Sequence, residues 1–337
     1  MTINSPFIIA EIGLSHDGSL GMAYAMVDAV SEAGGDAIKF QTHIANSEST
    51  VEEKFRVNFS RQDSTRFDYW RRTEFTESEW LDLAQYCAEK GLTFMSTPFS
   101  IDAVHLLAKT GMRDWKIGSG EFYSRDILDV ISDYGGNLYL STGMSTLKEI
   151  DQQMTFLSKT NLDVVLMQCT SMYPTPLEKV GLNVLDQYKS LYDTKIGLSD
   201  HSGTIFPSLL CMAKGIDVLE VHVVLSKLQY GPDVKASIDI GEFKRMVEVR
   251  NAFATLNNNP VDKDLMSNEL LELRELFTKS IATNADYSKG SVISNEMLSM
   301  KKPGSGIKYE HKDKLIGKYL KRDVKRNQLL KWDDIIL

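Results

Sequence analysis

Short apolar segments that end in polar residues recur along the first 225 positions of the chain. Each is rich in Val, Ile, Leu or Phe, as expected of a buried strand, and gains hydroxyl, amide or charged side chains toward its C-terminal end. The eight segments are 7–13, 36–43, 93–98, 115–121, 137–143, 164–170, 195–201 and 218–225. Apolar residues at i, i+3 and i+4 predict helices over 19–34, 77–90, 101–110, 125–134, 146–159, 204–214 and 240–256. This α/β alternation predicts a parallel (β/α)8 TIM barrel.

The pattern changes near residue 279. Residues 280–283, 286–292 and 301–306 form short strand-like runs separated by Gly and Pro turns, which indicates a small β-rich domain. The predicted organisation is therefore a barrel over 1–258, a linker over 259–278 and a β-rich domain over 279–337.

Composition places the chain among ordinary globular proteins. Of its 337 residues 42% are hydrophobic, and the formal charge is -8. No apolar run approaches the roughly 20 residues of a membrane helix, and the first residues lack the features of a signal peptide. We therefore expect a cytoplasmic protein with no membrane partner. The three cysteines (Cys87, Cys169 and Cys211) have no CxxC spacing, which argues against a disulfide framework or a structural zinc site.

Charge is distributed unevenly along the chain. Residues 289–331 carry twelve Lys or Arg against four Asp or Glu, whereas the whole chain is acidic. The basic stretch lacks interleaved aromatic residues and any nucleic-acid-binding motif, so we expect no nucleic-acid partner. A basic module that faces an anionic small molecule or a partner subunit fits better.

Polar side chains gather where the predicted strands end. In parallel barrels these C-terminal ends form one mouth, where active sites lie. A single such residue is more simply a solvated strand end, but a complete ring predicts a site. The ring comprises Glu11, Lys39, Gln41, Thr97, Lys116, Ser119, Glu121, Ser141, Thr142, Thr170, Ser199, His201, Glu220 and His222.

The ring contains residues suited to two kinds of ligand. Lys39 and Lys116, with the surrounding hydroxyls, suit a phosphate and a carboxylate. His201 and His222 come from neighbouring strands and could share one metal ion, although a lone buried histidine is more often a hydrogen-bonded core residue. The connection before the third strand is rich in Arg and aromatics between Phe55 and Arg72, and could be a lid, a partner-binding loop or a solvated insertion.

A series of motifs, in order along nearly the whole chain, resembles the sialic acid synthases, including the legionaminic and pseudaminic acid synthases. The motifs are Ala10 to Gly13 with His16 and Gly18, Lys39 to Gln41, Ser96 to Phe99, Lys116 to Glu121, Ser141 to Met144, Cys169 and Thr170 with Tyr173 to Pro176, Gly197 to His201, Glu220 with His222, and Gly231 to Asp233. Lys301 to Gly306 is similar to a loop of that family's antifreeze-like (SAF, β-clip) domain.

The resemblance implies an enzyme that condenses phosphoenolpyruvate with an amino sugar aldehyde such as N-acetylmannosamine and releases phosphate. It implies that His201 and His222 ligate Mn²⁺ (or Mg²⁺ or Co²⁺), and that the family's usual state is a domain-swapped homodimer. The catalytic residues would be Glu11, Glu121 and Tyr173. The substrate-binding residues would be Lys39, Gln41, Thr97, Lys116, Ser119, Ser141, Ser171, Ser199, Asp233 and Lys302.

The sequence departs from the family pattern at several of these motifs. The departures are Gln168 in place of His, Ser171 in place of Asn or Glu, Val221 and Val223 in place of a cation and an aromatic ring, and Lys302 in place of Arg. They leave two alternatives open. One is a synthase of the 3-deoxy-octulosonate phosphate type, which uses a phosphorylated aldose, and the other is a non-catalytic sugar- or phosphate-binding relative.

Overall fold

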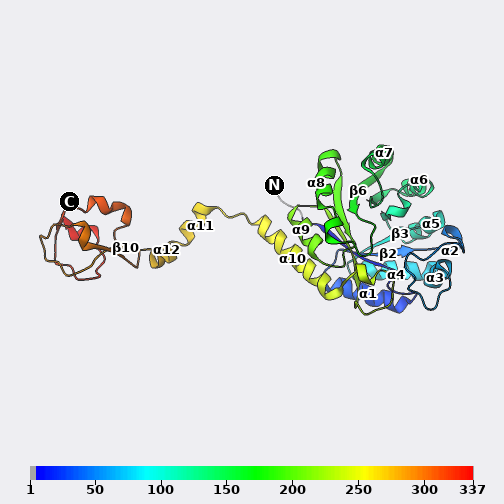
Figure 1. Ribbon diagram of the computed structural model, residues 1–337, viewed down its shortest axis with the longest axis horizontal. Helices are drawn as coiled ribbons and strands as arrows, with labels where there is room; N and C mark the ends of the chain where they lie inside the picture. The colour runs from blue at the N-terminus through cyan, green and yellow to red at the C-terminus, as the bar shows by residue number, and fades with distance from the viewer. Residues whose placement is uncertain (1–4, 337) are drawn as a thin grey trace. The chain divides into compact units, whose positions relative to one another are not determined.

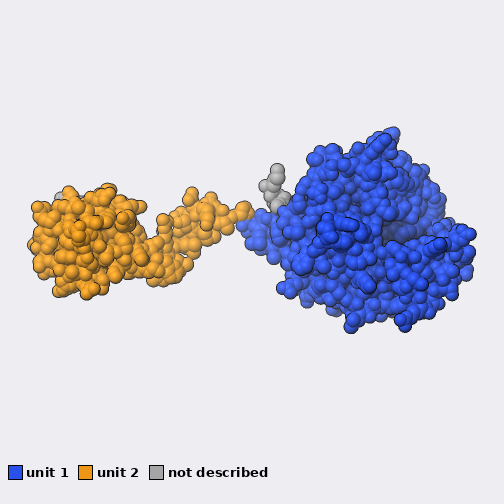
Figure 2. All heavy atoms as spheres, in the orientation of Figure 1, with its two compact units in different colours: residues 1–259 blue, residues 260–337 orange. Residues whose placement is uncertain are grey.

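The computed structural model describes residues 5–336, which divide into two compact units. The first unit extends to Asn259 and the second begins at Pro260 (Figure 2). Among residues 5–336, no helix combines the length and the apolar character needed to span a bilayer.

The first unit is the predicted closed parallel barrel (Figure 1). Its strands pair in sequence order and β1 pairs with β8, so the sheet closes on itself. The strands are β1 (Phe7–Gly13), β2 (Ala37–Thr42), β3 (Thr93–Pro98), β4 (Asp114–Ile117), β5 (Gly136–Ser141), β6 (Leu162–Cys169), β7 (Lys195–Asp200) and β8 (Val218–Val224). A short β9 (Ile238–Asp239) pairs with the end of β8.

Helices follow the strands and cover the outside of the barrel. They are α1 (Leu20–Glu32), α2 (Ala45–Glu48), α3 (Arg66–Thr73), α4 (Glu77–Glu89), α5 (Ile101–Lys109), α6 (Arg125–Tyr134), α7 (Leu147–Leu157), α8 (Leu182–Leu191), α9 (Phe206–Ala213) and α10 (Ile240–Asn258). Seven of them match the predicted segments. Sequence reasoning missed α2, α3 and α8, and it extended the fourth strand too far.

The fourth strand ends at Ile117 instead of continuing to residue 121. Gly118 and Gly120 interrupt the apolar pattern, and the chain forms one 3-10 turn over Ser119–Glu121, in which the Glu121 amide donates to the Gly118 carbonyl at 3.0 Å. The turn brings Ser119 and Glu121 to the mouth of the barrel.

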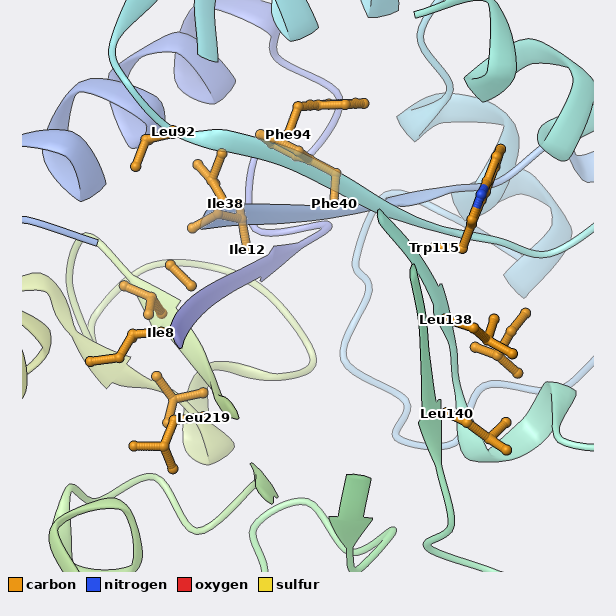
Figure 3. Packing of buried hydrophobic residues seen from close by; sticks show 14 of the residues in the cluster. Ile8, Ile12, Ile38, Phe40, Leu92, Phe94, Trp115, Leu138, Leu140 and Leu219 are labelled. Carbon is orange, nitrogen blue, oxygen red and sulfur yellow. The ribbon is translucent and has the colours of Figure 1, made fainter. Parts of the chain in front are cut away.

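The alternation of side chains along the strands separates two apolar layers. Residues such as Ile8, Ile38 and Phe40 point outward and pack beneath the helices (Figure 3). A second cluster fills the barrel interior, made of Ile9, Ala37, Met95, Tyr139, Val165, Met167 and Val218. Two positions further along the same inward faces, the side chains become polar: Ile9 is followed by Glu11, Ala37 by Lys39, and Val218 by Glu220. The apolar plug thus supports a polar layer at the C-terminal mouth.

The second unit begins with α11 (Lys263–Glu269) and α12 (Leu271–Phe277), which lie in the segment predicted to be a linker. The antiparallel pairs β10 (Ser280–Thr283) with β11 (Leu298–Lys301) and β12 (Tyr319–Leu320) with β13 (Ile335–Ile336) follow. These short strands surround a separate core that includes Ile281, Leu315, Leu320 and Leu330. Residues 286–292 form no strand and make only single bridges, at Tyr287 and Val292.

Candidate active site

Two lysine–glutamate ion pairs form the floor of the barrel mouth. The Lys39 Nζ lies 2.5 Å from Glu11 Oε2, and the Lys116 Nζ lies 2.5 Å from Glu220 Oε1. All four side chains are at most 4% exposed. Lys39 Nζ is also 3.9 Å from Glu220, so the four groups form one network of balanced charge. We call Glu11, Lys39, Lys116 and Glu220 the floor.

The floor charges determine one another's protonation. Burial alone would raise the pKa of Glu220, but Lys116 and Lys39 outweigh it and hold that pKa below its usual value. Burial likewise opposes a charge on Lys39, yet the Glu11 and Glu220 carboxylates raise its pKa. The pKa of Lys116 is lowered, because burial and the charge of Lys39 outweigh the attraction of Glu220. Glu220 is therefore a fixed carboxylate that also accepts a hydrogen bond from Ser199 Oγ at 2.9 Å.

Glu11 is held in a defined orientation. Its Oε1 accepts a hydrogen bond from Gln41 Nε2 at 3.0 Å, while its other oxygen pairs with Lys39. Glu11 is 2% exposed and lines the central cavity. An oriented carboxylate at the wall of a cavity is suited to handling a proton or a water molecule.

The two histidines lie together on the neighbouring strand ends, with ring centroids 5.2 Å apart. His201 Nδ1 lies 3.0 Å from the Thr170 carbonyl oxygen. Because a carbonyl can only accept, Nδ1 carries the proton and Nε2 keeps its lone pair. Burial and the neighbouring His222 lower the pKa of His201 to about 3. His201 is therefore a neutral imidazole with Nε2 available, which is the form that ligates metals.

These donors fit a metal ion with open coordination positions. Between residues 5 and 336, no group of three or more His, Cys, Asp or Glu is arranged to hold a metal, so the protein would supply the two imidazoles. Both line the cavity, where substrate and water could complete the coordination.

Hydroxyl groups converge around Gly143, on the other side of the mouth. Its amide donates to Ser119 Oγ at 2.9 Å, and that hydroxyl lies 3.1 Å from Cys169 Sγ. A methyl group at position 143 would lie 2.4 Å from Ser171 Oγ and 2.8 Å from Ser119 Oγ. Only glycine leaves this cluster of small donors open, an arrangement suited to phosphate oxygens.

Loop residues cover the mouth, and we call them the roof: Arg56, Arg66, Tyr69 and Trp70 from the connection between β2 and β3, with Asp233 from the loop after β8. Arg56 lies 2.5 Å from Asp233 Oδ1, and its guanidinium carbon is 4.1 Å from the centre of the Tyr173 ring. The Tyr173 ring stacks on His201 at 4.3 Å. Within the roof, Arg56 and Asp233 therefore lie next to the histidine end of the cavity.

His43 joins the roof to the floor. Its ring stacks between Trp70 and Phe99, at centroid distances of 3.8 and 4.2 Å. Its Nδ1 is 2.6 Å from Glu48 Oε1, and its Nε2 is 3.4 Å from the oxygen of Gln41, the residue that orients Glu11.

The floor and roof enclose a cavity of about 540 Å³. It is lined by all the predicted site residues of the barrel: Glu11, Lys39, Gln41, Thr97, Lys116, Ser119, Glu121, Ser141, Ser171, Tyr173, Ser199, His201, His222 and Asp233. Lys302 belongs to the second unit, where its Nζ lies 5.5 Å from the Phe277 ring centre, and its role stays a prediction.

Two members of the predicted polar ring have structural contacts instead. The Thr142 hydroxyl donates to the Met167 carbonyl at 3.1 Å, and the Thr170 hydroxyl donates to the Lys179 carbonyl at 2.7 Å. Each side chain satisfies a backbone oxygen where a strand meets its loop, and neither lines the cavity.

Sequence reasoning did not single out several residues that line the cavity. His43, Glu48, Arg56 and Trp70 are the clearest cases. For the residues between Phe55 and Arg72, the enrichment in Arg and aromatics was a usable signal, and the structure shows that this connection covers the barrel mouth.

Comparison with known proteins agrees with this geometry. The model of the NeuB family matches residues 26–260, more than half of the chain, and the model of the SAF domain matches residues 278–336. The chain belongs to the NeuB family. The N,N'-diacetyllegionaminic acid synthase of Legionella pneumophila is 32% identical over 338 residues, covering 98% of this NeuB chain and 94% of the relative. The N-acetylneuraminate-9-phosphate synthase of Homo sapiens is 30% identical over 304 residues, covering 88% and 82%.

A solved structure supports the same assignment. The N-acetylneuraminic acid (sialic acid) synthetase of Leptospira borgpetersenii, in complex with citrate, has a TM-score of 0.69 at 28% identity, covering 80% of this chain and 92% of that one. The expected family, the barrel and the SAF domain are confirmed. This NeuB-family protein is therefore an enzyme, a synthase of the class that makes nonulosonic (sialic-type) acids.

Proposed function

We propose that this synthase condenses phosphoenolpyruvate with the open-chain form of an unphosphorylated, N-acetylmannosamine-like amino sugar, giving a nonulosonic acid and phosphate. The observation that carries the proposal is the single cavity that holds both the Lys39 and Lys116 cations with their hydroxyl neighbours and the His201 and His222 pair. The first group suits phosphate and carboxylate, and the second suits an aldehyde to be polarised.

The proposed reaction forms one carbon–carbon bond and consumes one water. C3 of phosphoenolpyruvate attacks the aldehyde carbon, water adds at C2, and phosphate leaves by cleavage of its C–O bond. In this scheme the anionic substrate is bound by Lys39, Lys116, Thr97, Ser119, Ser141, Ser171 and Ser199. Binding it in the partly buried mouth limits the access of bulk water to the reacting atoms.

Other residues would orient the acceptor and move protons. Glu11, held by Gln41 and Lys39, would take or give the proton of the water that adds at C2. Glu121 lies at the same mouth, and Tyr173 and Asp233 would position the sugar under the roof.

His201 and His222 would hold Mn²⁺, or Mg²⁺ or Co²⁺. Such an ion, when bound, acts as a Lewis acid that polarises the aldehyde oxygen. The supporting observation is the bond of His201 Nδ1 to the Thr170 carbonyl, which leaves Nε2 unprotonated, with the exchangeable Tyr173 hydroxyl 3.3 Å from it.

The assembly proposed with this function is a homodimer in which the SAF domain of one subunit reaches the barrel of the other, bringing Lys302 to the sugar. The resemblance to the sialic acid synthases supports it. Light scattering should give twice the mass of one 38.0 kDa chain. A monomeric mass would count against it. Cytoplasmic location stays an expectation.

The decisive experiment measures phosphate release from phosphoenolpyruvate with Mn²⁺. N-acetylmannosamine and a 6-deoxy diacetamido hexose are tested as acceptors beside a phosphorylated aldose. We expect release that depends on an unphosphorylated amino sugar and that falls by at least about a hundredfold in His222→Ala. His105→Ala is the matched control, because His105 is exposed on α5 and bonds to Tyr134.

The other outcomes identify the alternatives. Release only with the phosphorylated aldose would establish an enzyme of the 3-deoxy-octulosonate phosphate type. Binding of sugar without release of phosphate would identify a non-catalytic relative.

A further inference from the structure

Arg56 occupies an unusual position for an exposed loop arginine. Its side chain is 40% exposed, yet it has two fixed partners, the Asp233 carboxylate at 2.5 Å and the face of Tyr173 at 4.1 Å. Asp233 binds one arm of the guanidinium fork and Tyr173 sets the orientation of its plane, while Arg56 lines the cavity. The group is thus pre-oriented to donate hydrogen bonds to a ligand.

The segment that carries Arg56 is anchored on both sides. Before it, Glu53 accepts from the Trp70 indole at 2.8 Å and pairs with Arg66 at 3.1 Å. After it, the Arg61 amide donates to the Tyr230 hydroxyl at 3.1 Å, which lies 3.2 Å from Ser60 Oγ. The roof loop is therefore joined to α3 and to the loop after β8, so Arg56 is held above the cavity.

Arg56 lies over the end of the cavity where the acceptor would react. Tyr173, beneath the guanidinium, stacks on His201 and its hydroxyl is 3.3 Å from His201 Nε2. A molecule whose aldehyde lies at the histidines extends its remaining polar groups toward the roof. Arg56 lines the cavity there, with its guanidinium carbon 4.1 Å from the centre of the Tyr173 ring.

The charges around Arg56 indicate which polar groups it can hold. The floor cations are balanced by the floor carboxylates. Outside the floor, the cavity is lined by four carboxylates (Glu48, Glu53, Glu121 and Asp233) and two guanidinium groups (Arg56 and Arg66), an acidic balance with histidines counted as neutral. A phosphate on the acceptor would face this excess of negative charge, whereas a hydroxyl or an acylamino carbonyl would not.

We propose that Arg56 is a specificity-determining residue that donates hydrogen bonds to uncharged oxygens of the acceptor sugar, and that the net negative charge of the cavity lining outside the floor disfavours a phosphorylated acceptor. The inference rests on the proposed function, because it takes the acceptor to be an amino sugar. It identifies a residue that recognises the sugar, and it predicts that the sugar carries no phosphate group.

The test separates sugar binding from phosphoenolpyruvate binding. Arg56→Met keeps the length of the stem and removes every donor, and Arg56→Lys keeps the charge but not the planar fork. We expect KM for N-acetylmannosamine to rise about ten- to a hundredfold in Arg56→Met, as for a lost hydrogen bond to a charged group, and by less in Arg56→Lys. KM for phosphoenolpyruvate should stay within about twofold.

Matched controls separate a lost contact from a disturbed loop. Arg61→Met makes the same chemical change on the same segment, at an exposed residue that does not line the cavity, and should leave both KM values unchanged. The Tm of each variant should stay within about 5 °C of the wild type, because the exposed Arg56–Asp233 pair contributes little to stability. N-acetylmannosamine 6-phosphate should bind the wild-type protein at least about tenfold more weakly than the free sugar in calorimetry.

Each result has a distinct meaning. Equal sugar affinity of the wild type and Arg56→Met, equal rises in both KM values, or tighter binding of the 6-phosphate would overturn the inference. Calorimetry reads the Arg56 contact without turnover, so it separates this failure from failure of the proposed function, which would appear as sugar binding without phosphate release.

Discussion

The floor and the roof use the same chemistry in two different surroundings. Lys116 and Glu220 meet at 2.5 Å with side chains 4% and 3% exposed, whereas Arg56 and Asp233 meet at the same distance with side chains 40% and 21% exposed. The two pairs share this distance but differ strongly in burial. A buried charge that loses its partner has no water to replace it, whereas an exposed one is solvated at once.

This difference in burial gives the floor and the roof separate roles. The floor stands on strands above the apolar plug of the barrel, so its charges are fixed before any ligand arrives. The roof is held by loop contacts that can exchange for contacts with a substrate. A rigid charged floor beneath an adaptable roof lets one barrel keep its reaction while its acceptor changes.

The largest expected effect comes from breaking a floor pair. Glu220→Ala leaves the Lys116 ammonium buried without its partner, and we expect the free energy of unfolding of the barrel to fall by about 3–5 kcal/mol. The matched change in the roof, Asp233→Ala, should cost about 1 kcal/mol or less, because Arg56 is solvated. Urea titration followed by Trp fluorescence measures both. Equal losses of unfolding free energy in the two variants would contradict the distinction between floor and roof.

His16 is buried but lies outside the strands. It tests whether burial alone makes a titratable group important for stability. Burial, with His43 nearby, lowers the pKa of His16 to about 3. The unfolded chain binds this proton near pH 6.5 and the folded chain does not, so stability is full above that pH and falls below it. Between pH 7 and pH 5 the wild type should lose about 2 kcal/mol through His16.

His16→Asn is the comparison for this effect. Its side-chain oxygen can still accept from the Gly18 amide, which donates to His16 Nδ1 at 3.1 Å in the wild type. Urea titrations at both pH values should show a smaller loss in the variant. A loss as large as that of the wild type would mean that His16 does not carry the dependence.

An effect on stability between those of Glu220→Ala and Asp233→Ala is expected around Gly143. In Gly143→Ala the new methyl group would lie 2.4 Å from Ser171 Oγ, 2.6 Å from the buried Cys169 Sγ and 2.8 Å from Ser119 Oγ. The two hydroxyls can rotate but the buried thiol has less room, so we expect a cost of about 1–3 kcal/mol. KM for phosphoenolpyruvate should rise at least about tenfold, because the displaced hydroxyls are its proposed ligands. Gly120→Ala is the control, since a methyl group there meets no atom within 4 Å. Similar KM values in both variants would contradict the assignment.

The floor was predictable from sequence because strand periodicity is local. Once Ile9 is inside the barrel, Glu11 must be inside as well, and the same holds for Ala37 and Lys39. The predicted polar ring nevertheless included two residues that do not line the cavity. Thr142 and Thr170 also follow apolar strands, but their hydroxyls donate hydrogen bonds to backbone carbonyls.

The roof could not be predicted in the same way. Its connection has no period over 49–65, and Arg56 finds Asp233 177 positions further along the chain. Helix α8 was missed for a related reason, because only Leu185 and Tyr188 are buried on it, too few to produce a clear apolar stripe. Tertiary partners define these elements more than local sequence does.

Closure of the barrel by β1 and β8 has a consequence for the order of events on the ribosome. Glu11 on β1 lies in register with His222 on β8. Strand β1 is synthesised first, but it can pair with β8 only after nearly the whole barrel has been translated. Until Val224 has emerged, one side of Phe7–Gly13 is an unpaired edge of apolar residues. The nascent chain must therefore shield this edge throughout elongation, and the catalytic mouth is completed in one late, long-range step.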